Sequence, residues 1–357
     1  MAKQLVMQSN ASIFNAVRAT MSKEFQDRIP ELTKQNMAEV GTMLTTNEFE
    51  KEYNQWQTAL INRIGKVLFE NYTLDNPLAK YIWGDMTWGD AIEIIAADVV
   101  KGRPMDYGRE GQSVDPFVKV SNQVKTEFHK IDEPIQYCTT IERDRVRRAF
   151  LSEGGLTRLL NLIVNQLYSS ANLDTWILTK NIFGYYISDS KKDSGFPLLP
   201  TQKIEYQDVT DETSAKKFLL QVKNTISAMA FPNNTFNPQK LHKTLNNRDL
   251  VLFIKPDIMN TIGVEAISAA FNAEELNLNV KIEPMDDFGA GPKGETTDDV
   301  AAVLTEKDFL LITQQLDDID SIWNPRGRYT NDFLTRQMSF GCNYFKDAVI
   351  WRKNWGE

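Results

Sequence analysis

The sequence predicts an α+β fold in which an N-terminal arm, an extended hairpin and a long helix accompany an inserted α/β unit. Three observations predict it. Glycine and proline punctuate residues 98–141, which also contain runs of alternating polar and apolar residues. Residues 152–183 keep one apolar stripe at helical spacing. From about 200 to 330, strand-like and helix-like runs alternate, and that order is typical of a compact α/β unit.

Size, charge and cysteine content limit the class of protein. The 357 residues exceed the size, about 250–300 residues, at which single hydrophobic cores stop growing. The net charge of −8 argues against a protein whose main task is gripping nucleic acid, because that task needs a concentrated Lys/Arg face. Cys138 and Cys342 supply no disulfide framework. No stretch approaches the ~18 apolar residues that span a bilayer, so we expect a cytoplasmic protein with no membrane partner.

The first 70 residues predict an arm followed by a helix. Residues 1–44 are polar with scattered apolar positions such as Phe14 and Val17, which favours short helices with little core of their own. Thr45 followed by Glu48 predicts a capping box at the start of the helix. Apolar residues then recur at helical spacing as far as Leu68, and they predict a buried face.

The segment 98–141 predicts an extended β-hairpin loop. Residues 89–100 are rich in Ile and Val and lead into it as a strand, and the alternating runs 117–120 and 124–131 carry its two faces. Residues 135–141 end it. Isolated two-stranded ribbons are marginal in water, so we expect the hairpin to lie on another surface. That surface is either the body of the same chain or a neighbouring copy.

The apolar stripe of residues 152–183 predicts a long helix, and its length suggests a central spine. Just before it stand Arg145, Arg147 and Arg148. Two interpretations remain open for these arginines: a solvated face paired with nearby carboxylates, or weak contact with a polyanion.

The remaining elements predict the inserted unit and a return to the main core. Residues 250–254 read as a buried strand, and Pro256 opens a helix at a position where its missing N–H costs nothing. Residues 277–283 predict a strand, and 300–312 predict two short ones. Residues 333–352 should return as a strand into the main core. The expected units, in chain order, are an arm and helix, 1–70; a peripheral domain, 71–185 with 331–357; and an inserted domain, 186–330.

A search for catalytic chemistry leaves one alternative. The two histidines, His129 and His242, match no metal-binding or nucleophile motif, so we expect no enzyme activity, metal or cofactor. The stretch 289–299, GAGPKGETTDD, resembles a phosphate loop but lacks the spacing of one. The alternative is therefore a divalent-metal or nucleotide-dependent α/β enzyme that uses Asp286, Asp287 and the loop 289–294.

The order of arm, extended loop, spine helix, inserted axial unit and closing strand resembles the Hong Kong 97-type major capsid protein of tailed bacteriophages. The final third of the sequence resembles the sequences of the major head proteins of small, short-tailed (podovirus-type) phages. The segments that carry this similarity are RDLVLFIKPDIMNTIG (248–263), NVKIEPMDDFGAG (279–291), LTEKDFLLI (304–312) and FGCNYFKDAVIWR (340–352).

The resemblance implies a structural protein that self-assembles into pentamers and hexamers of an icosahedral head around double-stranded DNA. It implies a scaffolding protein, a portal and non-specifically packaged DNA as partners, a place in the virion, and assembly in the host cytoplasm. A connector or tail protein is the further alternative. On this interpretation two sets of residues matter. Lys119, Lys125, Phe128 and Lys130 would contact neighbouring subunits, and Arg145, Arg147 and Arg148 would face DNA.

Overall fold

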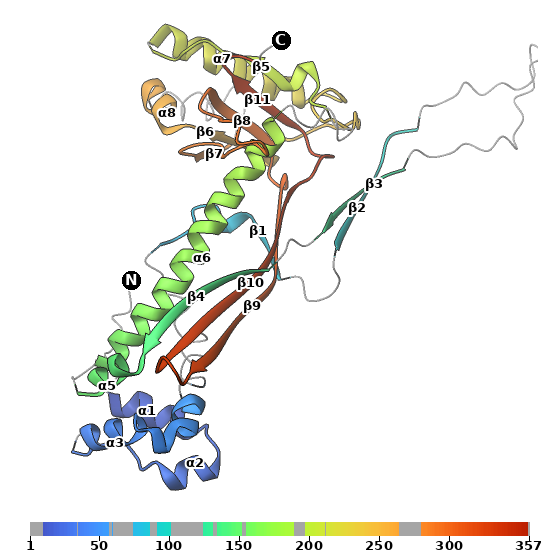
Figure 1. Ribbon diagram of the computed structural model, residues 1–357. Helices are drawn as coiled ribbons and strands as arrows, with labels where there is room; N and C mark the ends of the chain where they lie inside the picture. Colours follow the sequence, from blue (N-terminus) through green and yellow to red (C-terminus); the bar gives the residue numbers. More distant parts are fainter. Residues whose placement is uncertain are drawn as a thin grey trace, which may run out of the picture. The chain divides into compact units, whose positions relative to one another are not determined.

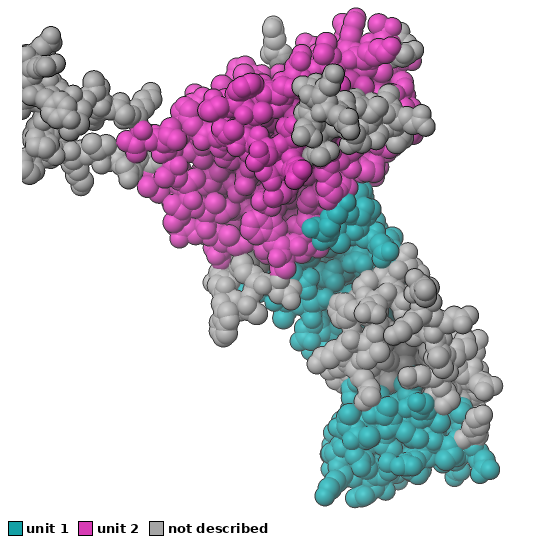
Figure 2. All heavy atoms as spheres, turned by 180° about the vertical axis from the view of Figure 1, so that it is seen from behind, with its two compact units in different colours: residues 1–80, 132–176, 314–338 teal, residues 81–131, 177–313, 339–357 magenta. Residues whose placement is uncertain are grey.

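The computed structural model (Figure 1) describes residues 10–33, 35–56, 59, 74–85, 91–100, 124–130, 134–151, 155–188, 197–210, 212–263 and 280–355. The chain forms two compact units (Figure 2). Unit 1 comprises residues 1–80, 132–176 and 314–338, and unit 2 comprises 81–131, 177–313 and 339–357. This division differs from the expected one because the hairpin and the C-terminal residues belong to unit 2.

The N-terminal residues of unit 1 form three helices, α1 (Asn10–Arg18), α2 (Lys23–Arg28) and α3 (Met37–Leu44). The expectation of an arm with little core of its own was wrong. Phe14, Val17 and Phe25 are buried in one cluster with Trp56, and the rings of Phe14 and Trp56 lie 5.6 Å apart. Each helix turns its few apolar side chains to the same side, so a mostly polar stretch still builds a core.

The predicted capping box was also wrong. Thr45 ends α3, and its hydroxyl donates to the Gly41 carbonyl at 2.8 Å. The next helical turn is a short 3-10 segment, Asn47–Phe49, which leads into helical residues 50–56. A hydroxyl at this position can serve either the carbonyls that precede it or the N–H groups that follow, and here it serves the carbonyls.

The long helix predicted over 152–183 is confirmed as α6 (Gly155–Ile187), preceded by the separate helix α5 (Arg143–Leu151). In unit 1, α6 buries Val164, Leu167 and Tyr168 in the core cluster. No helix among the described residues is long and apolar enough to cross a membrane.

A four-stranded sheet has the order β1-β9-β10-β4. Its strands are β1 (Ile82–Asp85), β9 (Leu310–Asn324), β10 (Tyr329–Cys342) and β4 (Ile135–Glu142). Cys138 of β4 faces Phe333 of β10 in antiparallel register. Residues 135–141, expected in the extended loop, therefore belong to this sheet. The second strand expected within 300–312 is β9, which begins with four buried residues, 310–313, and continues with exposed residues that mostly alternate with half-buried ones.

The α/β unit contains a five-stranded sheet of order β5-β11-β8-β6-β7 (Figure 1). Its strands are β5 (Lys203–Glu205), β11 (Ala348–Arg352), β8 (Val300–Glu306), β6 (Leu250–Ile254) and β7 (Lys281–Pro284). The helices α7 (Glu212–Met229) and α8 (Pro256–Ile262) pack on it through buried residues such as Phe218, Val222 and Ile258.

The predicted buried strand 250–254 and the helix opened by Pro256 are confirmed. The single returning strand predicted over 333–352 was wrong. It is two strands in different sheets: β10 pairs with β4, whereas β11 lies between β5 and β8. The turn at residues 343–347 separates them, and the closing residues complete the α/β sheet.

Candidate assembly surface

A two-stranded ribbon forms the root of the predicted extended loop. Strand β2 (Ala91–Ala97) pairs antiparallel with β3 (Val124–Lys130), so that Ala91 faces Lys130 and Ala97 faces Val124. Exposed and half-buried residues alternate along both strands. The ribbon therefore has two distinct faces, which the alternation in the sequence predicted for the second strand. Residues 117–120, the other predicted run, lie outside the described residues.

The inner face of the ribbon lies on the body of unit 2. The Lys125 ammonium donates to the carbonyl of Gln239. The Glu127 carboxylate accepts the backbone N–H of Tyr344 at 3.1 Å. The Ser339 hydroxyl donates to the Lys130 carbonyl at 3.0 Å. Polar contacts thus hold this face on residues of the same chain.

The outer face of the ribbon exposes large apolar side chains. Ile95 is 62% exposed, Val124 56% and Phe128 63%. Val99, just beyond β2, is also 61% exposed. Single exposed apolar residues are ordinary, but several on one face of a ribbon are typical of a surface that binds another molecule. We call Ile95, Val124 and Phe128 the outer patch.

The structure separates the four residues predicted to contact neighbouring subunits. Phe128 and Lys130 lie on the exposed outer face. Lys125 lies on the inner face, where its ammonium is bound within the chain. Lys119 lies outside the described residues. Sequence reasoning missed Ile95, because residues 94–97 are apolar throughout and carry no alternation that separates the two faces of β2.

The predicted DNA-facing residues Arg145, Arg147 and Arg148 are all exposed on α5. The Nε of Arg145 lies 3.7 Å from an oxygen of Glu142, the last residue of β4. The neighbouring Arg143 behaves differently. Its guanidinium lies 5.0 Å from the Tyr53 ring centre, and burial lowers its pKa. Three of the four arginines of α5 thus face solvent, whereas Arg143 packs in the core of unit 1.

The aspartates of the enzyme alternative are bound by a lysine. The Lys180 Nζ lies 2.9 Å from Asp286 Oδ2 and 2.6 Å from Asp287 Oδ2. Burial raises the pKa of Asp287, but the Lys180 hydrogen bond and the Gly289 N–H outweigh it and hold the pKa below its ordinary value. Across the described ranges, no group of three or more His, Cys, Asp or Glu side chains is arranged to hold a metal ion. This loop is therefore fastened to α6 by an ion pair.

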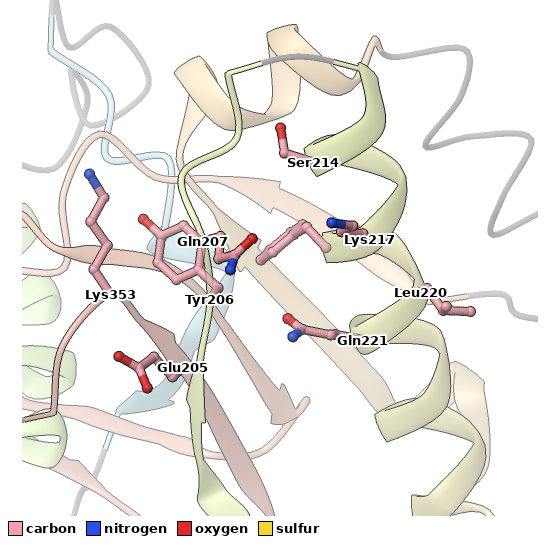
Figure 3. Close-up of a pocket in the computed structure, with 9 residues that line it drawn as sticks. Glu205, Tyr206, Gln207, Ser214, Lys217, Leu220, Gln221 and Lys353 are labelled. Atoms are coloured by element: carbon pink, nitrogen blue, oxygen red, sulfur yellow. The ribbon is translucent and has the colours of Figure 1, made fainter.

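An open groove of about 760 Å³ lies between β5 and α7 (Figure 3). Amide and apolar side chains make up much of its lining, and the pKa of Tyr206 is raised to about 12, mainly by burial. The lining residues are Phe218 and those labelled there, Glu205, Tyr206, Gln207, Ser214, Lys217, Leu220, Gln221 and Lys353.

Comparison with known proteins agrees with these observations. The major capsid protein of Bacillus phage B103 is 28% identical over 339 residues, which cover 94% of this chain and 71% of the relative. That of Streptococcus phage Cp-1 is 23% identical over 358 residues, covering 96% of this chain and 94% of the relative. The capsid structure of Staphylococcus phage Andhra matches with a TM-score of 0.60 at 11% identity, covering 80% of this chain and 86% of that one.

The structural likeness confirms the predicted fold class, the α+β fold of Hong Kong 97-type capsid proteins. The sequence model of the Phi29-like phage major capsid protein family matches residues 14–352, which is nearly the whole chain. The chain therefore belongs to the Phi29-like family of phage major capsid proteins.

Proposed function

We propose that copies of this chain assemble, as pentamers and hexamers, into an icosahedral head that encloses double-stranded DNA. The outer patch carries the proposal. A shell needs many contacts per subunit, and obligate interfaces bury on the order of 2,000–5,000 Å². A ribbon that exposes Ile95, Val124 and Phe128 on one face extends the area that a subunit can offer.

The outer patch docks on a neighbouring copy in this proposal. The inner face is already occupied by the chain's own residues, such as Gln239 and Tyr344. In this proposal the hairpin contacts its own chain through one face and a neighbouring copy through the other. The sequence left these two surfaces as alternatives, and each has a role here. Lys119 and Lys130 are proposed as further contacts, whereas the Lys125 ammonium serves the inner face.

In this proposal the residues that contact packaged DNA are Arg145, Arg147 and Arg148. They are exposed on one helix, and few cations suffice for weak, sequence-independent contact with phosphates. The overall charge of −8 suits a container, because a strongly basic lining would trap DNA through its phosphates. The scaffolding protein, the portal and assembly in the host cytoplasm follow from the capsid role and are part of the same proposal.

Electron microscopy of the chain, produced with and without its phage's scaffolding protein, tests the proposal. Closed shells are expected for the wild type, and Phe128→Asp should abolish them because a charge replaces an anchor of the outer patch. Phe231→Asp is the matched control: Phe231 is 69% exposed and belongs to unit 2 but not to the ribbon. Rings of one fixed symmetry, or a chain that stays monomeric under both conditions, would overturn the proposal. Equal effects of the two variants would remove the role of the outer patch.

A further inference from the structure

Strand β4 borders the four-stranded sheet, and among the described strands it pairs with β10 alone. The Arg143 N–H donates to the Arg328 carbonyl at 3.1 Å, which continues the antiparallel register of the two strands by one hydrogen-bonded pair. Hydrogen-bonded and non-hydrogen-bonded pairs alternate along such a ladder. Gln136, Cys138 and Thr140 therefore turn their backbone N–H and C=O groups away from β10. Across the described ranges, no backbone hydrogen bond reaches this outer edge of β4.

The outer edge of β4 lacks the features that keep edge strands apart. Residues 135–141, IQYCTTI, contain no charge and no proline, and their register with β10 has no bulge. On the other side of β10 in the same sheet, β9 carries Asp317, Asp318 and Asp320. Charges, prolines and bulges are what ordinarily prevent an exposed edge from pairing with another chain. The regular, uncharged edge of β4 is therefore suited to receive an added strand.

Strand β2 presents a second edge of the same kind. It pairs with β3 in a regular antiparallel register, and within the described part of the chain no further strand lies beside it. Its one charged residue is Glu93, whereas β3 carries Lys125, Glu127 and Lys130. β2 has seven residues and β4 has eight, so the two edges also match in length. Of the two strands of the ribbon, β2 is thus better suited to pair with a further strand.

We propose that β2 of one copy adds to the outer edge of β4 of the next copy, so that the ribbon extends the neighbour's four-stranded sheet. This rests on the proposed function, because it names the surface that the ribbon meets. Ile95 of the outer patch belongs to β2, so one neighbour can contact both the patch and the edge. The two edges belong to different strands, and the contact is therefore heterologous. A heterologous contact repeated from copy to copy closes a ring when its rotation allows, and pentamers and hexamers are such rings.

Hydrogen exchange of the unassembled, full-length chain tests the pairing without any shell. The probe is a peptide of residues 90–98, DAIEIIAAD, added at about 1 mM. It should slow exchange of the Cys138 and Thr140 amides by roughly two- to tenfold, as expected when the peptide concentration is about one to ten times its Kd. The amide of Thr139 already faces β10 and should not change. Unaltered exchange at Cys138 and Thr140 overturns the pairing.

Two control peptides show whether the sequence of β2 matters. A peptide with the residues of 90–98 in scrambled order should leave the β4 amides unchanged, and so should VKTEFHK, the sequence of β3. Protection by the scrambled peptide, or by the β3 peptide alone, overturns the assignment of β2 as the added strand.

The variant Cys138→Pro tests the same edge in assembly. Proline at this position removes an outward N–H but no bond to β10, and edge strands tolerate it there. The variant should lose the peptide's effect at Thr140 and give few closed shells, while the amides of β10 keep their protection and report that it is folded. Cys138→Val restores the N–H and should behave as the wild type. A normal yield of shells from Cys138→Pro overturns the role of this edge.

The two readouts separate this pairing from the proposed function. Closed shells of the wild type, together with no effect of the β2 peptide, would remove the pairing and leave the proposed function standing. Protection of Cys138 and Thr140 by that peptide, in a chain that forms no shells, would have the opposite meaning.

Discussion

Gly184 of α6 packs against the backbone of Ala290 so closely that a Cβ at position 184 would lie 2.6 Å from the Ala290 carbonyl carbon. Gly289, at a φ of +69°, approaches α6 in the same way, and its Cβ would lie 2.5 Å from the Asn181 nitrogen. The Asn181 side chain accepts the Ala290 N–H at 3.0 Å. Gly184 and Gly289 therefore permit close backbone contact between α6 and this loop, which explains Gly289 without a phosphate ligand.

Gly184→Ala should destabilise unit 2 because the new methyl group meets backbone that cannot turn aside. Overpacking of this kind costs about 1–3 kcal/mol, measured as a lower free energy of unfolding in urea. Tyr185→Ala is the matched control, since Tyr185 is the next residue of α6 and is 48% exposed. It should change stability by about 0.5 kcal/mol or less. An equally small effect at Gly184 would contradict the close approach.

Local signals in the sequence predicted much of this fold, because the elements concerned carry their own periodicity. Strand β6 is apolar throughout, and α7 repeats Phe218, Val222 and Ile226 at helical spacing. What failed was the choice of partner strand. Residues 135–141 alternate much as 124–130 do, yet β4 pairs with β10 and β3 with β2. Pairing depends on contacts distant in sequence, and alternation alone does not name the partner.

The candidate site shows the same division. The place of Phe128 on a different face of its strand from Glu127 and His129 could be predicted, because the sequence alternates there. The contact of Lys125 could not, because its partner is the backbone carbonyl of Gln239, and any residue type carries that group. The burial of Asp332 could be predicted from the sequence. It precedes Leu334 by two positions on β10, and residues two apart in a strand point to the same face of the sheet, here the buried one.

Glu306→Gln should destabilise the α/β unit because one carboxylate serves two lysines. Its oxygens lie 2.5 Å from Lys243 Nζ and 2.9 Å from Lys346 Nζ, and the Asp347 N–H donates to it at 2.9 Å. The lysines are about one-quarter exposed, so we expect the free energy of unfolding to fall by about 2 kcal/mol, below the range for a fully buried pair. Asp308→Asn is the control, since its carboxylate is 45% exposed and lies 3.9 Å from Lys346. Equal effects of the two variants in urea denaturation would contradict this role.

Replacement of Arg145, Arg147 and Arg148 by Gln should weaken contact with DNA uniformly across sequences. In a binding titration with assembled shells opened to DNA, the slope of log K against log salt should fall by about 0.9 for each phosphate that the variant no longer neutralises. Arg326→Gln is the control, because Arg326 is an exposed arginine on the β9–β10 turn. An unchanged slope in the triple variant would remove these residues from the DNA-facing surface.

Asp332→Asn should stabilise the protein at high pH and have little effect at low pH. The side chain is fully buried, and the Ser321 hydroxyl donates to its Oδ1 at 2.6 Å. Within the described part of the chain, Oδ2 has no hydrogen-bond partner. Burial accordingly raises the pKa of Asp332 from 3.8 to about 7. The folded state therefore holds a proton that the unfolded chain releases at lower pH.

The sign of this effect follows from proton binding. Between about pH 4 and about pH 7 the unfolded chain binds fewer protons at this residue, so stability falls as pH rises and is constant above that range. The full cost is about 4 kcal/mol, and Asn avoids it while still accepting the Ser321 hydrogen bond. Denaturation of both proteins at about pH 5 and about pH 8 should give a larger difference at the higher pH. Asp320→Asn, at an exposed position of β9, should show no such trend, and a pH-independent difference for Asp332→Asn would mean that the buried carboxyl is charged throughout.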